Sequence, residues 1–433
     1  MITWKHRLCA LIGLSGFFLL VYGFANAWTA ERESVGVVYF AWEGWIPFVS
    51  WMIIPYLSID LFFVLAPFLI VDRRELHLFC ARGGTVILAA GVCYLLFPLT
   101  LAVERPVPEG LLGMLWMIFI AMDQPHNLMP SLHIALGTIP AAVFLVHFRG
   151  WRRGLLVGWF ILIGISTLTT YQHHFVDIYT GLLLGLLSLH LIRKTPQLWH
   201  PSINWVASGG YAAGGLFTGI VLVIGWPESF WLLWPLLAMG LASASSLGFL
   251  PASPIKRDGR LVPVSQLLWS PVLFGQWLSW LYYRRKSPPW NEVVPGVYLG
   301  RLLTAREAQE LAGKGIHAVL DVAAEFSESP VLREKIYSQM EWRDLTAPTQ
   351  SELRAAAYFI HKHRSRKVYV HCKAGYSRSA AAVGAYLLLH GAVASLKEVE
   401  IALHAARPGI VLRPEIRSAW QQLMVSREEV QAP

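Results

Sequence analysis

Long apolar runs in the first 250 residues constrain the fold of this chain more than any other sequence feature. Each run has about 17–25 residues, the length that a helix needs to cross a lipid bilayer. The composition agrees, since 55% of the residues are hydrophobic and only 15% are charged. We therefore predict a polytopic all-α membrane bundle, with runs at residues 8–27, 46–71, 85–103, 132–148, 155–171, 175–192, 205–226 and 230–250.

The basic residues indicate which side of the membrane each loop occupies. Most Lys and Arg near the runs fall on one side, and only Arg32 and Arg105 fall on the other. Such an excess in short loops marks the cytoplasmic side. We therefore expect a multi-pass integral membrane protein, as in a bacterial inner membrane, with a cytoplasmic C-terminal domain. The net charge of +9 then reflects topology, and we expect no nucleic-acid partner.

The composition becomes that of a soluble domain after a basic, proline-containing linker at residues 284–289. We expect a six-span membrane domain at 1–200, two further spans and an interfacial helix at 201–285, and a cytoplasmic domain at 286–433. The interfacial helix is assigned to residues 267–283, because this apolar segment has basic residues at both ends. The first run could be a cleaved signal peptide ending at Ala27, although its length favours a retained anchor.

The C-terminal domain contains a strand, a short loop and a helix around one cysteine. Residues 368–370 predict a buried strand and residues 380–389 predict a helix. The loop between them would direct backbone N–H groups and the helix N-terminus at one point, which favours a bound anion. Cys372 would be held there as a thiolate nucleophile, and Arg378 could bind two phosphoryl oxygens. The predicted phosphate-binding residues are Lys373, Ala374, Gly375, Tyr376, Ser377 and Arg378.

The spacing of Cys372 and Arg378, between a histidine and a serine, is the signature of cysteine-dependent phosphatases. Residues 297–423 resemble the dual-specificity phosphatase family. Segments 344–349 and 371–375 are most similar to its branch acting on phosphatidylglycerophosphate. The resemblance implies an α/β phosphatase domain in which Cys372 forms a cysteinyl-phosphate that Arg378 stabilises.

The same resemblance assigns roles to the neighbouring polar residues. It implies that Asp344, on a mobile loop, is the general acid and that Ser379 donates a hydrogen bond to the departing sulfur. His371 is expected to orient the loop and not to act as a base. Segments 296–300 and 318–322 predict strands and segment 305–314 a helix, which fits an α/β sheet. Asp321 is a rival general acid, but its place at a strand end favours a structural role.

Two histidines and one aspartate in the membrane part form a second candidate site. His133 and His173 are separated by two predicted spans and a turn, so both lie at the same membrane face. His173 and Asp177 are four residues apart and share one helical face. Asp177 could fix the tautomer of His173, which could then attack phosphorus, while His133 could protonate a departing alcohol. Alternatively, these histidines only anchor helix ends. His174 is expected to face the interface.

Residues 46–192 resemble the type 2 phosphatidic acid phosphatase superfamily through the patterns Pro-Ser-x-His and His-x-x-x-Asp. The resemblance implies that His173 is the nucleophile, Asp177 its orienting partner and His133 the general acid. It also implies that Arg105 is a phosphate-binding residue that this sequence retains from the family pattern. Two cations of the family pattern are absent, one of them replaced by Pro98. This is more similar to the branch of inositol phosphorylceramide and sphingomyelin synthases, which move a phospho-head-group between lipids. Hydrolysis and transfer both stay open.

These patterns predict an integral membrane phosphoric monoester hydrolase whose partners are membrane lipids and a phosphorylated lipid or protein substrate. We expect no metal and no other cofactor, because neither chemistry needs one and the sequence contains no recognisable metal-ligand set or dinucleotide loop. Three alternatives stay open. They are a membrane-tethered protein tyrosine, serine or threonine phosphatase, a non-catalytic module that binds phosphorylated ligands, and a transporter or scaffold anchored by the helices.

Overall fold

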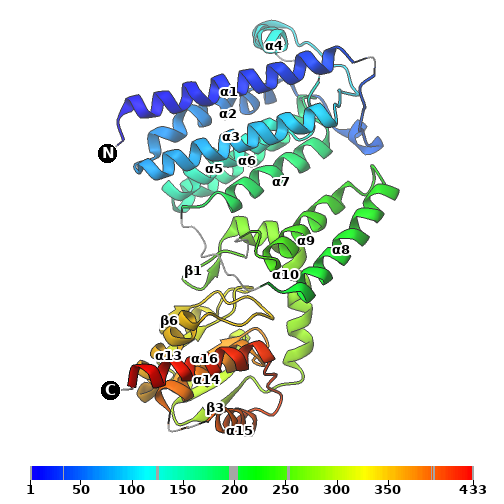
Figure 1. The fold of residues 1–433 in the computed structure, drawn as a ribbon. Coiled ribbons are helices and arrows are strands. Elements are labelled where there is room, and N and C mark those ends of the chain that lie inside the picture. The colour runs from blue at the N-terminus through cyan, green and yellow to red at the C-terminus, as the bar shows by residue number, and fades with distance from the viewer. Residues whose placement is uncertain are drawn as a thin grey trace. The chain divides into compact units, whose positions relative to one another are not determined.

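The computed structural model describes residues 2–32, 34–122, 126–194, 203–250, 254–391, 393 and 395–431. The chain forms two compact units, of which unit 1 contains residues 1–196 and 218–234 and unit 2 contains residues 197–217 and 235–433. The predicted fold class is confirmed, since apolar helices fill the N-terminal region and an α/β sheet domain forms the C-terminal region (Figure 1).

Unit 1 is a bundle of helices that pack side by side (Figure 1). Its helices are α1 (Trp4–Ala30), α2 (Ile53–Leu69), α3 (Arg73–Leu96), α4 (Gly110–Met122), α5 (Leu132–His147), α6 (Gly150–Thr169) and α7 (Phe175–Leu191). Three short 3₁₀ helices accompany them, η1 (Ala41–Trp45), η2 (Ser50–Met52) and η3 (Phe230–Leu232). Buried apolar side chains from α1, α2, α3 and α5, such as Leu14, Ala66, Val86 and Ile139, form one shared core.

Helices α5 and α7 approach each other closely, and this brings their N-termini together. A Cβ atom on Gly181 would lie 2.5 Å from the backbone oxygen of Ser131, and one on Gly185 would lie 2.3 Å from Thr138 Oγ1. Small residues are thus needed at this contact, as in many membrane helix pairs. The backbone N–H of Ser131 donates to the backbone oxygen of Asp177 at 2.9 Å. The two helix starts that carry the histidine motifs are therefore adjacent.

All eight predicted apolar runs fall on apolar helices. In the part of the chain that the structure describes, five helices are long and apolar enough to cross a membrane, Trp4–Ala30, Ser50–Leu69, Arg73–Leu96, Gly150–Thr169 and Trp205–Ile224. The other runs fall on the shorter apolar helices Leu132–His147, Phe175–Leu191 and Phe230–Ser246. The bounds predicted for one run, 85–103, are wrong, because α3 begins after the cap Asp72 and ends at Leu96. Charged residues in its first turns hid its start, and Pro98 disfavours helical geometry at Phe97.

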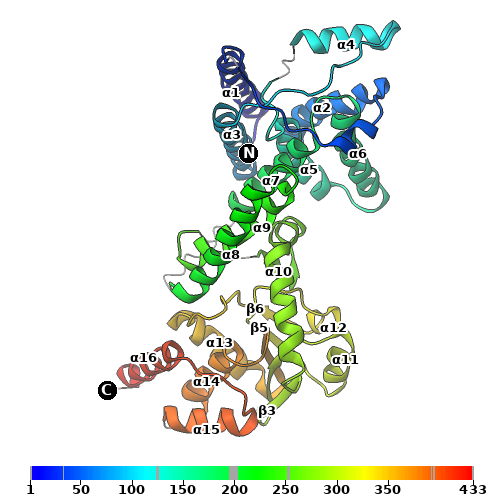
Figure 2. The same cartoon turned by 90° about the vertical axis from the view of Figure 1, so that its right-hand side faces the viewer.

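Unit 2 begins with helices that precede the sheet domain in the chain. They are the first part of α8 (Trp205–Ile224), α9 (Leu233–Ser246) and α10 (Pro263–Arg284). A hairpin of β1 (Lys256–Arg257) and β2 (Arg260–Leu261) lies between α9 and α10. The predicted interfacial helix corresponds to α10, which is longer than expected because Pro263 starts it at a position that tolerates proline. Figure 2 shows that α10 leads directly into the sheet domain.

The sheet domain contains five strands in the order β3-β4-β7-β5-β6. They are β3 (Trp290–Val294), β4 (Val297–Arg301), β7 (Val368–Cys372), β5 (Ala318–Asp321) and β6 (Ile336–Gln339). Only the β3–β4 pair is antiparallel, and β7 lies in register with β4 and β5 so that Val370 is opposite both Leu299 and Leu320. Cys372 therefore ends the central strand, at the edge where parallel sheets bind ligands.

Helices cover both faces of this sheet (Figure 2). Alternate strand residues such as Leu299 and Val370 pack against α13 (Gln350–His363), α14 (Arg378–His390) and α16 (Pro414–Gln431). The intervening residues, such as Tyr298 and Tyr369, pack against α11 (Ala305–Gly313) and α12 (Pro330–Arg333). The remaining helices of the domain are α15 (Leu396–Ala406) and the 3₁₀ helix η4 (Arg364–Arg366). The strands and helices predicted at 296–300, 305–314, 318–322, 368–370 and 380–389 are confirmed.

Candidate active site

The loop between β7 and α14 has the shape of an anion cradle. Gly375 has a φ of +73°, and a Cβ atom there would lie 2.7 Å from the backbone of Gly300, so only glycine fits. The loop's carbonyl groups are held from outside: the backbone N–H of Leu302 donates to Lys373, that of Val411 to Tyr376, and the Arg407 guanidinium to Ala374. The Ser377 carbonyl accepts from Ala381 and starts α14.

Cys372 lies at the base of this cradle and is only 3% exposed. Its Sγ atom accepts a hydrogen bond from the backbone N–H of Gly375 at 3.2 Å and lies 3.5 Å from Ser379 Oγ. Burial alone would raise the pKa of the Cys372 thiol, but the Arg378 charge and the hydrogen bonds from Ser379 and Gly375 lower it below its ordinary value. The thiolate, which is the nucleophilic form, is therefore favoured.

Arg378 is buried and held in a fixed orientation. Its Nη1 and Nη2 atoms contact the two carboxylate oxygens of Glu325 at 3.0 and 2.8 Å, and Nη1 also donates to the Trp342 carbonyl at 2.9 Å. This bidentate pairing fixes the plane of the guanidinium group. Sequence analysis did not identify Glu325, although its place in the loop after β5, at the ligand edge of the sheet, was a usable signal.

Asp344 reaches the same cradle from the loop after β6. Its Oδ2 atom lies 2.9 Å from Lys373 Nζ, and its Oδ1 atom lies 3.4 Å from Arg378 Nη2. Burial would raise the pKa of the Asp344 carboxyl group, but the charges of Arg378 and Lys373 hold this pKa well below its ordinary value. In the free site Asp344 is thus a carboxylate. It can carry a proton only after a bound anion pairs with Arg378 and Lys373 in its place.

Helices α8, α9 and α10 also contribute to this site, which sequence analysis did not predict. Gln276 of α10 accepts a hydrogen bond from Lys373 Nζ and donates to the Tyr211 hydroxyl of α8 at 2.9 Å. Asn204, just before α8, donates to the Leu345 carbonyl at 2.7 Å, directly beside Asp344. Tyr283 of α10 makes an edge contact with Tyr376, with ring centroids 5.5 Å apart.

Two arginines hold the acid loop in place. Arg343 donates to the backbone oxygen of Ser245 in α9 at 2.6 Å. Arg413, near the start of α16, donates to the Leu345 carbonyl at 3.1 Å. The segment that carries Asp344 is therefore bonded on one side to the helices before the sheet domain and on the other to its last helix.

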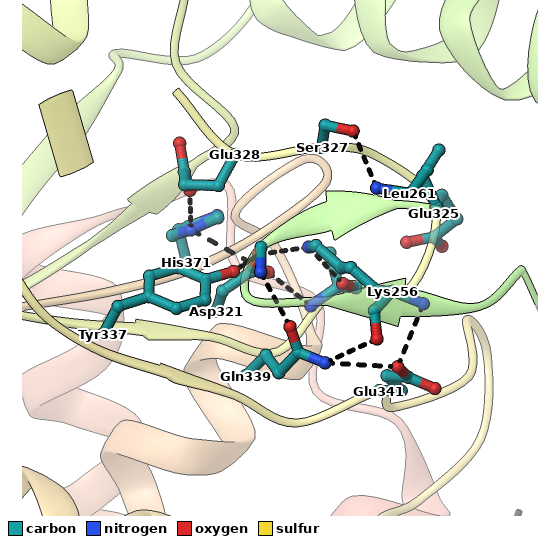
Figure 3. A network of polar contacts seen from close by, with 12 residues as sticks. Lys256, Leu261, Asp321, Glu325, Ser327, Glu328, Tyr337, Gln339, Glu341 and His371 are labelled. Carbon is teal, nitrogen blue, oxygen red and sulfur yellow. Dashed lines mark hydrogen bonds and ion pairs between the residues drawn. The ribbon is translucent and has the colours of Figure 1, made fainter. Parts of the chain in front are cut away.

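Behind the cradle lies a buried polar cluster (Figure 3). His371 Nε2 lies 2.6 Å from Glu328 Oε2 and 3.8 Å from Asp321 Oδ1. Burial lowers the pKa of His371, but the two carboxylates outweigh burial and raise it to about 9. Asp321 is paired with Lys256, which fits the predicted structural role. Within the described residues, Asp321, Glu328 and His371 are the one group of acidic and histidine side chains close enough to share a metal ion.

The second candidate site, in unit 1, brings its three predicted residues to one end of α5 and α7. His173 Nδ1 lies 3.6 Å from Asp177 Oδ2, which is too long for a hydrogen bond. Asp177 instead accepts from the backbone N–H of His174 at 2.8 Å. His133 stacks on Tyr56, with ring centroids 4.0 Å apart. Among the described residues, His133 Nε2, His173 Nδ1 and Asp177 Oδ1 are buried polar atoms with no hydrogen-bond partner.

The expectation that His174 faces the interface is wrong, because this side chain is buried. Its Nδ1 atom lies 3.1 Å from Glu43 Oε2, and its Nε2 atom accepts from the backbone N–H of Ala102 at 3.0 Å. Glu43 comes from η1, which folds over the start of α7, and sequence analysis did not identify it. Arg105 donates to the backbone oxygen of Tyr171 at 3.2 Å, two residues before His173.

Two family models match this chain, one in each of its two parts. Residues 297–428 match the catalytic domain of dual specificity phosphatases, and residues 81–200 match the PAP2 superfamily. The second match begins later than the predicted resemblance at 46–192.

Several characterised proteins resemble the C-terminal domain. Dual specificity protein phosphatase 22-B of Danio rerio is 34% identical over 126 residues, covering 27% of this chain and 67% of the relative. Dual specificity protein phosphatase 15 of Mus musculus is 31% identical over 30% of this chain and 56% of its own length. Phosphatidylglycerophosphate phosphatase PTPMT2 of Arabidopsis thaliana is 26% identical over 31% of this chain and 61% of its own length.

Among solved structures, PTPMT1 in complex with PI(5)P is 23% identical and has a TM-score of 0.31, covering 34% of this chain and all of that chain. The chain thus spans from 56 to 67% of the three curated relatives named above. The matched residues contain the whole cradle, from Cys372 to Arg378, together with Asp344. The chain therefore belongs to the dual specificity phosphatase family and is an enzyme of the phosphoric monoester hydrolase class.

Proposed function

We propose that this chain is an integral membrane phosphatase that hydrolyses phosphomonoesters on phospholipid head groups through a cysteinyl-phosphate intermediate. The observation that carries the proposal is the cradle in which Cys372 accepts from Gly375 while Glu325 holds Arg378. A module that only binds phosphorylated ligands would need the cradle alone. The lowered pKa of Cys372 and the presence of Asp344 at the cradle favour turnover.

In the first chemical step, the Cys372 thiolate attacks phosphorus, the S–P bond forms and the ester P–O bond breaks. Arg378 and the N–H groups of the loop stabilise the charge on the phosphoryl oxygens. Asp344 gives its proton to the departing alkoxide. The bound phosphate group must first pair with Arg378 and Lys373 in place of Asp344, because these cations otherwise keep Asp344 ionised.

In the second step, water attacks phosphorus and the S–P bond breaks. Asp344, now a carboxylate, accepts the proton that the water loses, and inorganic phosphate forms. The electron pair of the broken bond returns to Cys372 as a thiolate. Ser379, whose hydroxyl lies 3.5 Å from the sulfur, stabilises this leaving group by donating a hydrogen bond.

Helix α10 supports a lipid substrate. Its residues Phe274, Trp277, Leu278 and Tyr282 are exposed apolar side chains, and Arg284 and Lys286 at its end stack on aromatic rings. Exposed aromatic residues next to basic ones are typical of helices at membrane surfaces. The same helix contacts the cradle through Gln276, so the site would meet head groups at high effective concentration. The similarity to phosphatidylglycerophosphate phosphatase PTPMT2 of Arabidopsis thaliana supports the same substrate class.

The test is phosphate release by the full-length chain in vesicles. Phosphatidylglycerophosphate in the bilayer and a soluble phosphotyrosine peptide are compared, with Cys372→Ser protein as the control. We expect at least about tenfold higher kcat/KM on the lipid and no release by the control. A preference for the peptide would favour a membrane-tethered protein phosphatase. Tight binding of phosphorylated ligands without release would favour a binding module.

The histidine cluster supports a second activity, a lipid phosphatase or phospho-head-group transferase on the outer face. Three buried polar atoms of this cluster make no hydrogen bond, namely His133 Nε2, His173 Nδ1 and Asp177 Oδ1, and this favours a bound polar group there. The test uses the Cys372→Ser chain in vesicles containing a phospholipid donor. We expect residual release or transfer that His173→Ala abolishes and the exposed His147→Ala does not. Equal activity of both variants would favour simple anchoring.

The positive-inside pattern supports a multi-pass protein with a cytoplasmic C-terminal domain and no nucleic-acid partner. A fluorescent reporter that folds only in the cytoplasm, fused after residue 433, should fluoresce in cells. Fluorescence from a reporter that folds only outside the cytoplasm would reverse the proposed orientation.

A further inference from the structure

The hairpin β1–β2 lies outside the matched catalytic domain, yet it is bonded to that domain within unit 2. The backbone N–H of Gly259 donates to Gln339 Oε1 at 2.9 Å, and the Gln339 side chain returns a bond to the Lys256 carbonyl at 2.9 Å. Gly259 has a φ of +73°, and a Cβ there would lie 2.6 Å from the Arg333 side chain. The hairpin therefore packs closely against the sheet domain at Gln339 and Arg333.

Lys256 extends from this hairpin into the interior of the sheet domain (Figure 3). Its ammonium group is fully buried, donates to Asp321 Oδ2 and donates to the Ala323 carbonyl at 3.0 Å. Asp321 also accepts from the Tyr337 hydroxyl at 2.6 Å and from the backbone N–H of Ala323 at 2.9 Å. A buried ammonium group and a buried carboxylate each depend on the other, because either alone would be an uncompensated charge.

The contacts of this pair lead directly to the catalytic loop. Asp321 faces His371, which lies next to Cys372 in β7 and is paired with Glu328. The loop between Asp321 and Glu328 carries Glu325, which holds Arg378. The hairpin binds this loop as well: the backbone N–H of Leu261 donates to Ser327 Oγ at 2.9 Å, and the backbone N–H of Glu328 donates to the Gly259 carbonyl at 2.7 Å.

We propose that Lys256 is a positioning residue for the phosphatase site, supplied by the hairpin between α9 and α10, that balances the buried charge behind Cys372 and fixes the loop that holds Arg378 and His371. The inference rests on the proposed function in one respect, that Cys372 and Arg378 are the catalytic groups. Its consequence is that the catalytic domain extends functionally beyond the residues matched by its family, into the segment that follows the membrane helices.

The charges of this cluster determine in which direction the pKa of the Cys372 thiol should shift when one of them is removed. Asp321 and Glu328 carry two negative charges, and Lys256 and protonated His371 carry two positive ones. Removal of the Lys256 charge leaves one net negative charge behind Cys372, which disfavours the thiolate and raises the thiol pKa. Removal of the Asp321 charge acts in the opposite direction. The other groups that act on this thiol are not substituted in any variant, namely Arg378, Ser379, Tyr369, Arg407 and the N–H of Gly375.

The experiment uses the full-length chain in detergent with four variants, Lys256→Met, Asp321→Asn, the double variant and Lys256→Arg. Arg257→Met, an exposed residue of the same hairpin, is the matched control. The first measurement is the pH midpoint of Cys372 alkylation by iodoacetamide, with the signal of Cys372→Ser protein subtracted because Cys9, Cys80 and Cys93 are also free thiols. The second measurement is kcat and KM for para-nitrophenyl phosphate.

We expect Lys256→Met to raise the alkylation midpoint by about half a pH unit or more, and Asp321→Asn to lower it. The double variant should return the midpoint toward the wild-type value, since both charges are then absent. Lys256→Met should lower kcat about tenfold or more while KM changes little, because the Lys256 side chain is fully buried and out of a substrate's reach. Lys256→Arg should recover part of kcat, and Arg257→Met should match the wild type.

A wild-type midpoint in every folded single variant would overturn the proposal, as would unchanged kcat in Lys256→Met. If Lys256→Met does not fold, the opposite shift expected for Asp321→Asn decides the question. The alkylation measurement needs no turnover. Shifted midpoints in a chain that releases no phosphate would therefore support the positioning role while rejecting the proposed hydrolysis.

Discussion

Asp344 is paired with Lys373 and Arg378 in the free site, and this pairing determines how its replacement should behave. Asp344→Asn keeps the shape of the side chain but removes the proton donor and acceptor. We expect kcat to fall about 10²–10⁴-fold, the usual contribution of general acid–base catalysis. Steady-state phosphate release measures this effect, with the exposed Glu415→Gln as control. An Asp344→Asn variant with wild-type kcat would assign the proton transfer to another group.

His371 gives the domain a pH-dependent stability whose sign follows from its raised pKa. The folded pKa is about 9, above the ordinary value of 6.5, because Asp321 and Glu328 outweigh the effect of burial. The stabilisation is therefore complete below pH 6.5, declines as the pH rises, and is lost above about pH 9. Its upper limit is about 3 kcal/mol for a shift of this size.

Thermal unfolding of the full chain between pH 6 and 10, followed by near-ultraviolet circular dichroism, measures this dependence. His371→Asn should unfold at a lower temperature than the wild type at pH 6.5. Above pH 7 its unfolding temperature should decline much less with pH than that of the wild type. A His371→Asn variant with the same pH dependence as the wild type would show that another group titrates in this range.

For single residues, local sequence patterns were enough for a prediction, whereas pairings between residues far apart in the chain could not be predicted. A strand, a tight loop and a helix are consecutive in the chain, so the spacing of Cys372 and Arg378 was enough to predict the cradle. Glu325 pairs with Arg378 across 53 residues, and Lys256 pairs with Asp321 across 65. Neither pairing leaves a periodic or spaced pattern, because the sheet topology alone brings these side chains together.

Among the helices, α10 contributes a side chain to the catalytic cradle. Gln276 accepts from Lys373, which also pairs with Asp344. In Gln276→Ala, Lys373 loses one of its two partners among the described residues and keeps Asp344, so a substrate must compete more strongly for both groups. We expect kcat/KM to fall about three- to tenfold, within the range of one lost hydrogen bond to a charged group.

Kinetics on a soluble phosphomonoester provide the measurement, and Gln266→Ala, an exposed glutamine of the same helix, is the matched control. Equal kcat/KM for Gln276→Ala, Gln266→Ala and the wild type would mean that α10 only tethers the domain.

The sequence identified helices and strands well, because their periodicity and apolar length are local properties. It did not identify which helices belong with the catalytic domain. Apolar length predicted that the α8 run could cross a membrane, but the contacts of Asn204 and Tyr211 depend on where that helix ends in space. The boundary expected at residue 286 follows composition, whereas unit 2 also includes residues 197–217 and 235–285.

In the whole molecule, the two candidate sites lie in different units. We therefore expect a substitution in one site to leave the activity of the other unchanged. Cys372→Ser should abolish phosphate release from a soluble phosphomonoester and leave the histidine-dependent lipid activity unchanged. His173→Ala should do the reverse. Assay of both activities in each single variant and in the double variant measures this independence. Loss of both activities in either single variant would mean that one site depends on the other.

We propose that Cys372 carries the phosphoryl group during turnover. The measurement mixes the full-length chain with a ³²P-labelled phosphomonoester, quenches the reaction in alkaline detergent within milliseconds and locates the label by peptide mapping. We expect label on the peptide that contains Cys372, formed in a burst and absent from Cys372→Ser. Turnover with no label on that peptide, or with label on the His173 peptide alone, would contradict it.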